Sequence, residues 1–414
     1  MLLSGQGASV AVSKLPCRAL EAVGGAPSRH LFLAATCSVA DENEVALIEF
    51  AESSNAARVV AVLAHPNEVW SLAAHPTDAR LLLTVSSSGA ERAGLLLRSD
   101  ALNDQAPPSS AGAPAQRALP LQTLCQVPRA GKSSSSNDSS SSSSTLRKLL
   151  WHPADDGSPR EAASERFLAV SDNAVRLFDV HGAAVEDIGD TRLGSSSSAG
   201  AAPRQSLCAA WDPHHTSLAH VATGGDVETV DLRIMEVVRR IERAHEPLCR
   251  DMDCNPNKPH HLVTCGDDRS VKFWDVRKPG APVKVVPRAH SHWASAVRYN
   301  RFHDQLVLSA GTDGLVQLLS LSSISSAPLL DGASGDELED PAPGDPAEPR
   351  AEQQQRQERT GAADQLVRSY EDHVESVYGA AWSACDAWVF ATLSSDGMLA
   401  VNRVPTTEKY KILL

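Results

Sequence analysis

Two neighbouring carboxylates, Asp267 and Asp268, follow a short apolar run and a glycine within residues 261–275. Paired carboxylates can act as general acid and base when both face one substrate. The sequence Gly-Asp-Asp is typical of a tight turn, however, and adjacent residues in a turn point their side chains in different directions. We therefore predict no catalytic residue here and interpret Asp268 as structural.

The other motifs that suggest chemistry lack required members. Residues 130–134 resemble the end of a phosphate-binding loop, but Gln126 stands where the first glycine of G-x-x-x-x-G-K-S is required. Histidines at 214 and 215, 260 and 261, and 290 and 292 have no cysteine or carboxylate set at ligand spacing, and no two of the eight cysteines form a Cys-x-x-Cys pair. We expect no metal, no cofactor and no enzymatic activity.

Charge and hydropathy narrow the class of partner. The net charge is -13, and residues 331–364 supply ten acidic against three basic residues. The rest of the chain has no Lys- and Arg-rich patch, which argues against nucleic acid or an anionic membrane surface as the main partner. The N-terminus lacks the features of a signal peptide and no run of 18 apolar residues follows. We therefore expect a cytoplasmic protein with reduced thiols.

Three segments are too poor in apolar residues to offset the entropy lost on ordering. They are the Ser-rich segment 105–145, the Ser- and Gly-rich segment 194–203, and the acidic, Gln-rich segment 330–364. We predict that all three are disordered surface loops.

Residues 245–274 recur twice toward the C-terminus with fixed internal spacing. Each copy has a histidine, a Ser or Thr 19 residues later and an Asp 23 residues later, followed by Trp, Leu or Asn. The three sets are His245, Thr264, Asp268 and Trp274; His290, Ser309, Asp313 and Leu319; and His373, Thr392, Asp396 and Asn402. Such constant offsets indicate a repeating unit, with the acidic segment inserted between the second copy and the third.

Weaker copies in the N-terminal half bring the number of units to seven. Within each unit, short β-branched or aromatic runs are separated by turn residues, which predicts antiparallel strands rather than helices. The predicted units are residues 8–63, 64–104, 146–190, 204–243, 244–288, 289–328 and 366–414.

These units resemble the WD40-repeat family, in which each repeat forms one four-stranded blade of a β-propeller. Variants of the family's Trp-Asp signature occur at residues 177–180, 230–233 and 273–277. The resemblance implies an all-β fold, a single seven-bladed WD40 propeller over residues 8–414. It also implies that His245, Thr264, Asp268 and Trp274 form a hydrogen-bonded tetrad, which Leu319 and Asn402 leave incomplete in two other units.

One end of the chain must supply the strand that closes the ring of blades. The apolar residues 412–414 lie at the same offset from Asn402 as residues 284–286 lie from Trp274. This offset favours closure by the C-terminus, and closure by the N-terminus is the alternative.

Large side chains recur three and five residues after the repeat histidines, where each blade's innermost strand is expected to begin. They are Glu68, Trp70, Arg250, Trp293 and Tyr378. Trp, Tyr and Arg at the face of a propeller suit a protein-binding hot spot. The alternative is that these aromatic residues pack between blades.

The C-terminal half carries a closer resemblance. Runs such as GDDRSVKFWDVRK, AHSHWASAVRYNRFHDQLVLS and the terminal KYKILL are similar to the family of propellers that interact with the EARP and GARP vesicle-tethering complexes. The resemblance implies a monomeric, non-enzymatic scaffold that binds these complexes at the trans-Golgi network and endosomes. It would promote their membrane recruitment in endosomal recycling and retrograde transport, without inserting into the membrane itself.

Two other function classes stay open on the sequence. Trp274 to Arg277, and in part residues 230–233, fit the Trp-Asp-x-Arg pattern of propellers that act as substrate receptors of cullin–RING ubiquitin ligases. An enzyme built on this scaffold would need titratable groups converging on the central channel, and the sequence indicates none.

Overall fold

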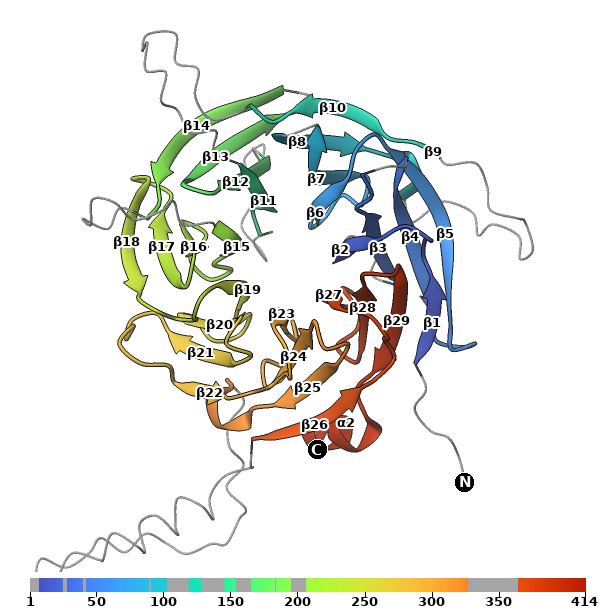
Figure 1. The fold of residues 1–414 in the computed structure, drawn as a ribbon, viewed down its shortest axis with the longest axis vertical. Coiled ribbons are helices and arrows are strands. Elements are labelled where there is room, and N and C mark those ends of the chain that lie inside the picture. The colour runs from blue at the N-terminus through green and yellow to red at the C-terminus, as the bar shows by residue number, and fades with distance from the viewer. Residues whose placement is uncertain are drawn as a thin grey trace, which may run out of the picture.

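Seven antiparallel sheets stand around a central axis in a closed ring (Figure 1). This computed structural model describes residues 7–24, 28–39, 42–88, 91–102, 119–128, 145–153, 165–182, 184–194, 206–326 and 364–414. Six sheets have four strands, and the first gains a fifth from a short parallel strand. The predicted all-β, seven-bladed propeller is confirmed.

Each blade runs from an innermost to an outermost strand. Blade one has β2 (Cys17–Ala22), β3 (His30–Thr36), β4 (Asn43–Ala51), β5 (Ala56–His65) and β9 (Leu119–Pro120); blade two has β6 (Val69–Ala74), β7 (Leu81–Ser88), β8 (Glu91–Arg98) and β10 (Gln122–Gln126); blade three has β11 (Leu146–Trp151), β12 (Glu165–Ser171), β13 (Ala174–His181) and β14 (Ala184–Arg192); blade four has β15 (Ser206–Trp211), β16 (Leu218–Thr223), β17 (Asp226–Asp231) and β18 (Glu236–Ile241). Blade five has β19 (Cys249–Cys254), β20 (His261–Gly266), β21 (Val271–Asp275) and β22 (Lys284–Val286); blade six has β23 (Ala294–Tyr299), β24 (Leu306–Gly311), β25 (Val316–Ser320) and β26 (Gln365–Tyr370); blade seven has β27 (Val377–Trp382), β28 (Val389–Ser394), β29 (Met398–Arg403) and β1 (Ala8–Ala11). The described residues also form two short 3-10 helices, η1 (Asp100–Leu102) and η2 (Ser322–Ile324), and the α-helix α2 (Thr406–Leu413).

The core lies between adjacent blades. The second strand of a blade is covered on both faces by its neighbours, so β3, β24 and β28 are buried along their whole length and read as nearly continuous apolar runs. Phe167 and Phe178 stack at 5.1 Å within blade three and pack with Leu83 and Leu96 of blade two. Such interlocking of neighbours fixes the innermost strands around the axis.

The N-terminus closes the ring. β1 pairs antiparallel with β29, from Ala8 opposite Val401 to Ala11 opposite Met398 (Figure 1). The prediction of closure by residues 412–414 was wrong, because these residues lie at the end of α2. Glu408 and Ile412, one helical turn apart, pack that helix against blades six and seven.

Two outermost strands also differ from the predicted layout. Residues 119–128 were predicted as part of a disordered loop, but they form β9 and β10, because Leu124, Cys125 and Val127 join the core between blades two and three. β26 pairs with β25, so the acidic insertion falls inside the sixth sheet rather than between units. Apart from these strands and their end residues, the three predicted loops lie outside the described residues.

Candidate protein-interaction site

Blade five contains an unbroken chain of hydrogen bonds among the four side chains that the repeat spacing singled out. Nδ1 of His245 lies 2.8 Å from Oδ1 of Asp268, and Nε2 lies 2.8 Å from Oγ1 of Thr264. Nε1 of Trp274 donates to the same hydroxyl oxygen at 2.9 Å. Burial lowers the pKa of His245 despite the nearby carboxylate, so the ring is neutral at pH 7. A neutral ring can donate to Asp268 and accept from Thr264, which leaves none of these polar groups unpaired.

Blade six contains a shorter series of the same hydrogen bonds. Nδ1 of His290 lies 3.1 Å from Oδ1 of Asp313, and Nε2 lies 2.7 Å from Oγ of Ser309. Leu319 occupies the position of the tryptophan and packs in the apolar cluster around Phe273. The series of hydrogen bonds therefore ends at the hydroxyl of Ser309.

Blade seven departs from the expected direct contact between His373 and Asp396. Nε2 of His373 lies 2.7 Å from Oγ1 of Thr392, but Nδ1 lies 2.9 Å from Oγ of Ser394, which in turn donates to Asp396. The equivalent of Ser394 in blades five and six is a glycine, Gly266 or Gly311, where a Cβ would lie within 2.6 Å of the histidine ring. A serine there inserts its hydroxyl between the imidazole and the carboxylate.

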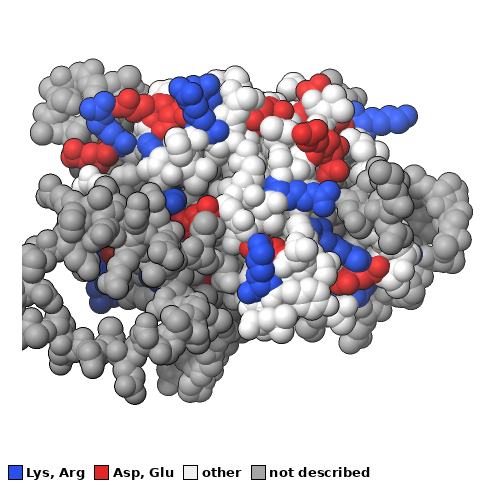
Figure 2. All heavy atoms as spheres, turned by 90° about the horizontal axis from the view of Figure 1, so that it is seen from below, with Lys and Arg blue, Asp and Glu red and all other residues white. Residues whose placement is uncertain are grey.

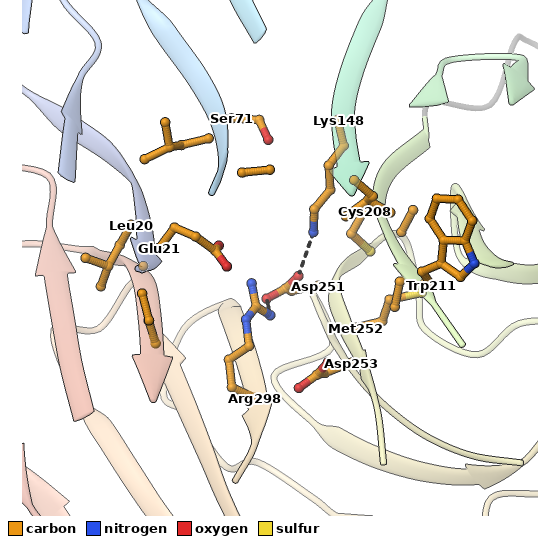
Figure 3. A pocket seen from close by; sticks show the side chains of 18 of the residues that line it. Leu20, Glu21, Ser71, Lys148, Cys208, Trp211, Asp251, Met252, Asp253 and Arg298 are labelled. Atoms are coloured by element: carbon orange, nitrogen blue, oxygen red, sulfur yellow. Dashed lines mark hydrogen bonds and ion pairs between the residues drawn. The ribbon is translucent and has the colours of Figure 1, made fainter. Parts of the chain in front are cut away.

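Charged side chains line the central channel, which has a volume of about 990 Å³ (Figure 3). Arg298 of β23 donates to Asp251 of β19, and Nζ of Lys148 lies 3.8 Å from the same carboxylate. Glu21 and Asp253 also line the channel, and burial raises the pKa of both. The sequence indicated no titratable groups converging on the axis, and this finding corrects that interpretation. The groups come from four different blades, which is why their convergence is not visible in the sequence.

A β-bulge interrupts the innermost strand of every blade near its first residue. The pairing register skips one residue in six blades and two residues in blade four. A bulge leaves the extra residue unpaired and re-aims its side chain. The single residues skipped are Arg18, Trp70, Arg147, Arg250, Ser295 and Tyr378, and all six line the channel.

Cation–π contacts join several of these side chains at the channel. The Cζ atom of Arg92 lies 3.9 Å from the ring centroid of Trp70. Arg18 lies over two rings, with its Cζ 5.1 Å from the centroid of Trp70 and 4.7 Å from that of Tyr378. Nε1 of Trp70 donates to Oγ of Ser87 at 2.7 Å and to Glu68 at 3.1 Å. Trp70 and Tyr378 therefore pack between blades and also line the channel.

The other side of the channel carries a second cation–aromatic pair. The Cζ atom of Arg250 lies 4.4 Å from the ring centroid of Trp293, and its Nε donates to Asp267. Trp293 is 41% exposed. We call Arg18, Trp70, Arg92, Arg147, Arg250, Trp293 and Tyr378 the channel rim.

The rim combines aromatic surface with positive charge. Arg147 and Arg250 pair with Asp172 and Asp267, whereas no carboxylate pairs with Arg18 or Arg92 among the described residues. Burial and the neighbouring cations Arg147 and Arg18 lower the pKa of Arg92. Tryptophan, tyrosine and arginine are the side chains enriched at hot spots of protein interfaces.

Counting from the repeat histidines found Glu68, Trp70, Arg250, Trp293 and Tyr378. The last four line the channel, whereas Glu68 only accepts a hydrogen bond from Trp70. The count missed the arginines of blades one, two and three, Arg18, Arg92 and Arg147. Blades one and three have no marker histidine before the innermost strand, so no count could start there. A weaker signal could have located two of these arginines. Arg18 and Arg147 each follow the first residue of a short, mainly apolar segment.

The outer edge of the disc has a different character. In the edge view of Figure 2, basic and acidic side chains are intermingled, and neither sign forms a continuous patch. Among the residues that the structure describes, no helix is both long and apolar enough to cross a membrane. At the rim, by contrast, Arg18, Arg92 and Arg250 lie over the rings of three aromatic residues, Trp70, Tyr378 and Trp293.

Comparison with known proteins covers nearly the whole chain. It is 33% identical over 390 residues to EARP and GARP complex-interacting protein 1 of Homo sapiens, with 92% of each chain covered. The EARP-interacting protein homolog of Danio rerio is 33% identical over 407 residues, with 96% of each chain covered. The chain belongs to the family of EARP and GARP complex-interacting proteins.

Two family profiles agree with this assignment. The EIPR1 beta-propeller family matches residues 133–319, and the WD domain, G-beta repeat family matches residues 364–401. A more distant relative, WD repeat-containing protein DWA2 of Arabidopsis thaliana, is 28% identical over 380 residues. Both resemblances drawn from the sequence are confirmed.

Proposed function

We propose that this protein is a non-enzymatic, monomeric scaffold that binds the EARP and GARP tethering complexes through the channel rim. The names of its relatives state interaction with these complexes. The observation that carries the proposal is the set of bulges that turns arginine and aromatic side chains of separate blades toward one channel.

The rim has the physical properties that a docking surface requires. Its aromatic rings offer large contact area, and their geometry is fixed before binding by cation–π contacts and by the hydrogen bond from Trp70 to Ser87. A surface that is already ordered loses little conformational entropy when a partner binds. The unpaired guanidinium groups of Arg18 and Arg92 favour an acidic segment of the partner.

The cellular role follows from the partner. By binding the tethers, the protein promotes their recruitment to endosomes and the trans-Golgi network, and so supports endosomal recycling and retrograde transport. It acts there as a cytoplasmic, peripheral protein. Neither membrane insertion nor nucleic-acid binding forms part of the proposal.

Affinity purification of the full chain from cells tests this function. We expect subunits of the tethering complexes in the eluate of the wild-type protein. Recovery of a cullin adaptor in their place would contradict the proposal and support a ubiquitin-ligase receptor. The matched variant for that outcome is Arg277→Ala, because the Arg277 guanidinium pairs with Asp275 at 2.7 Å within the Trp-Asp-x-Arg pattern and lies outside the rim.

A further inference from the structure

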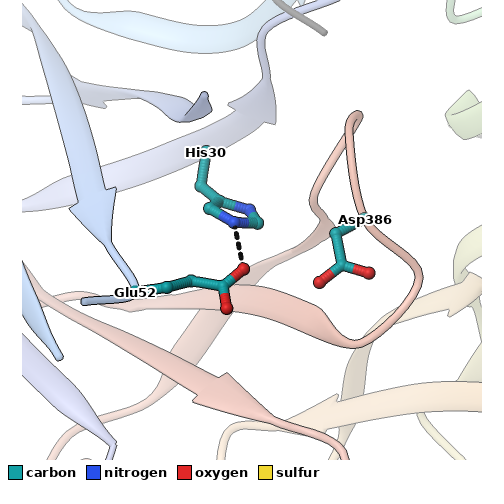
Figure 4. A group of neighbouring side chains, drawn as sticks. All are labelled: His30, Glu52 and Asp386. Carbon is teal, nitrogen blue, oxygen red and sulfur yellow. Dashed lines mark hydrogen bonds and ion pairs between the residues drawn. The ribbon is translucent and has the colours of Figure 1, made fainter. Parts of the chain in front are cut away.

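A cysteine, a histidine and a glutamate form a relay at the seam between the first and the last blade. Cys385 lies in the loop between β27 and β28 of blade seven. His30 begins β3 and Glu52 follows β4, both in blade one (Figure 4). Cys385 is partly exposed and Glu52 is exposed, so a small solute can reach the relay.

The three side chains are connected through the two nitrogens of one imidazole ring. Sγ of Cys385 lies 3.4 Å from Nδ1 of His30, and Nε2 of His30 lies 2.7 Å from Oε1 of Glu52. Oγ of Ser383 lies 2.9 Å from the same Nδ1 and 3.3 Å from the sulfur. A thiol next to an imidazole that a carboxylate orients is the arrangement that activates a sulfur nucleophile.

The hydrogen bonds to Cys385 favour the ionised thiol, whereas the neighbouring charge of Asp386 opposes it. Burial opposes ionisation of Cys385, but hydrogen bonds from His30 and Ser383 outweigh it, so the pKa of this thiol is lowered. The hydrogen bond with Cys385 raises the pKa of His30 against the effect of burial, and Glu52 adds to the rise. Five other cysteines differ, because burial raises the pKa of each thiol: Cys17, Cys37, Cys125, Cys254 and Cys265.

We propose that Cys385 is a nucleophilic thiol that is modified by exchange with low-molecular-weight disulfides, with His30 as its proton acceptor and Glu52 as the residue that positions His30. The sulfur of Cys385 gives its proton to Nδ1 of His30 and attacks one sulfur of the disulfide. A new S–S bond forms, the old one breaks, and the departing thiolate takes the proton from His30. The added group then occupies the seam between blades one and seven. This proposal is independent of the proposed function.

Asp386 lies beside the relay, and one donor atom each of His30, Glu52 and Asp386 lies within 4.8 Å of the others (Figure 4). Nε2 of His30 is already engaged by Glu52 at 2.7 Å. We therefore interpret His30 and Glu52 as a hydrogen-bonded pair and Asp386 as a neighbouring carboxylate.

Incubating the full-length protein with glutathione disulfide at pH 7 tests the proposal, with the modified peptides identified by mass spectrometry. We expect Cys385 to react first, about tenfold faster than Cys125, because a lowered pKa raises the fraction of thiolate. Cys385→Ser should abolish the fast reaction. The matched control Cys125→Ser, at a partly exposed thiol with a raised pKa, should leave it unchanged.

The pH profile of alkylation by iodoacetamide tests the relay itself. Glu52→Gln removes the charge that supports the His30 imidazolium, so we expect the reaction of Cys385 to slow severalfold at pH 7 and its pH midpoint to rise. An unchanged profile, or a Cys385 no more reactive than Cys125, would overturn the proposal. Protection of Cys385 by stoichiometric zinc that is lost in Asp386→Ala would also overturn it, because the group would then be a metal site.

Discussion

At the scale of single residues, Asp268 is the side chain through which blade five pairs its buried histidine. Asp268→Ala leaves Nδ1 of His245 without its acceptor inside the blade. We expect a loss of about 1–3 kcal/mol in the free energy of unfolding at pH 7, measured by chemical denaturation. The control Asp190→Ala, at an exposed position on β14, should change stability little. Equal effects of the two substitutions on stability would contradict a structural role for the His245–Asp268 contact.

A second residue-scale prediction concerns acid stability. Burial opposes ionisation of Asp212, but the nearby His220 ring, whose Nε2 lies 3.8 Å from Oδ2, and hydrogen bonds from the backbone N–H groups of His215 and His214 lower its pKa to about 2. A carboxylate with a depressed pKa stabilises the fold above its ordinary pKa, and this contribution is lost as the pH falls from about 4 toward 2.

Asp212→Asn keeps an oxygen acceptor for these N–H groups but removes the charge. We expect up to about 2 kcal/mol less stability at pH 7 and a flatter decline of stability between pH 4 and pH 2. Urea denaturation at several pH values measures both effects. A variant whose decline is as steep as that of the wild-type protein would show that Asp212 does not carry the acid sensitivity.

The residue-scale contacts were predictable only where the blades are alike. The spacing placed His245 and His290 beside Asp268 and Asp313, as the structure has them. The spacing could not place Asp396. Blade seven has Ser394 where blades five and six have glycine, and the serine hydroxyl occupies the space beside the imidazole of His373.

At the scale of elements, β1 is the strand that closes the ring. Deleting residues 1–11 removes the four-residue pairing with β29, and we expect a clear fall in melting temperature, measured by thermal unfolding. Deleting residues 1–6 is the matched control, since it keeps β1, and it should have little effect. A shorter chain that unfolds at the wild-type temperature after loss of residues 1–11 would contradict closure by the N-terminus.

The outermost strand of blade two gives a second element-scale prediction. Val127 is buried, and Leu124 and Cys125 pack against the same core. We therefore expect removal of residues 119–128 to destabilise the fold, whereas removal of the serine tract at 133–144 should be tolerated. Limited proteolysis of the two deletion proteins compares them directly. Greater protease sensitivity of the serine-tract deletion would contradict the assignment of residues 119–128 to the folded core.

Outermost strands escaped prediction for a physical reason. Inner strands such as β24 are buried on both faces and have a long apolar signature, whereas β1 and β10 are short and half-exposed. β10 also follows a segment whose composition predicts disorder, and pairing with β8 supplies the order that its own residues do not. Sequence patterns therefore located the blades better than they located the edges of the blades.

At the scale of the whole molecule, closure of the ring brings the channel rim together. Arg18 of blade one lies over Tyr378 of blade seven, and these residues come from opposite ends of the chain. The rim therefore depends on the closed ring as well as on its own side chains. The family and part of the channel rim could be predicted from the sequence, but the bulges that orient the rim side chains could not.

The most direct test measures the affinity of purified EARP complex for immobilised protein in three forms. The wild-type chain is compared with the rim variant Trp293→Ala and with the edge variant Ile234→Ala on blade four, each of which replaces an exposed apolar side chain. We predict that the rim variant binds at least about tenfold more weakly while it unfolds like the edge variant, which binds as the wild type does. Full affinity in the rim variant together with lost affinity in the edge variant would contradict docking through the rim.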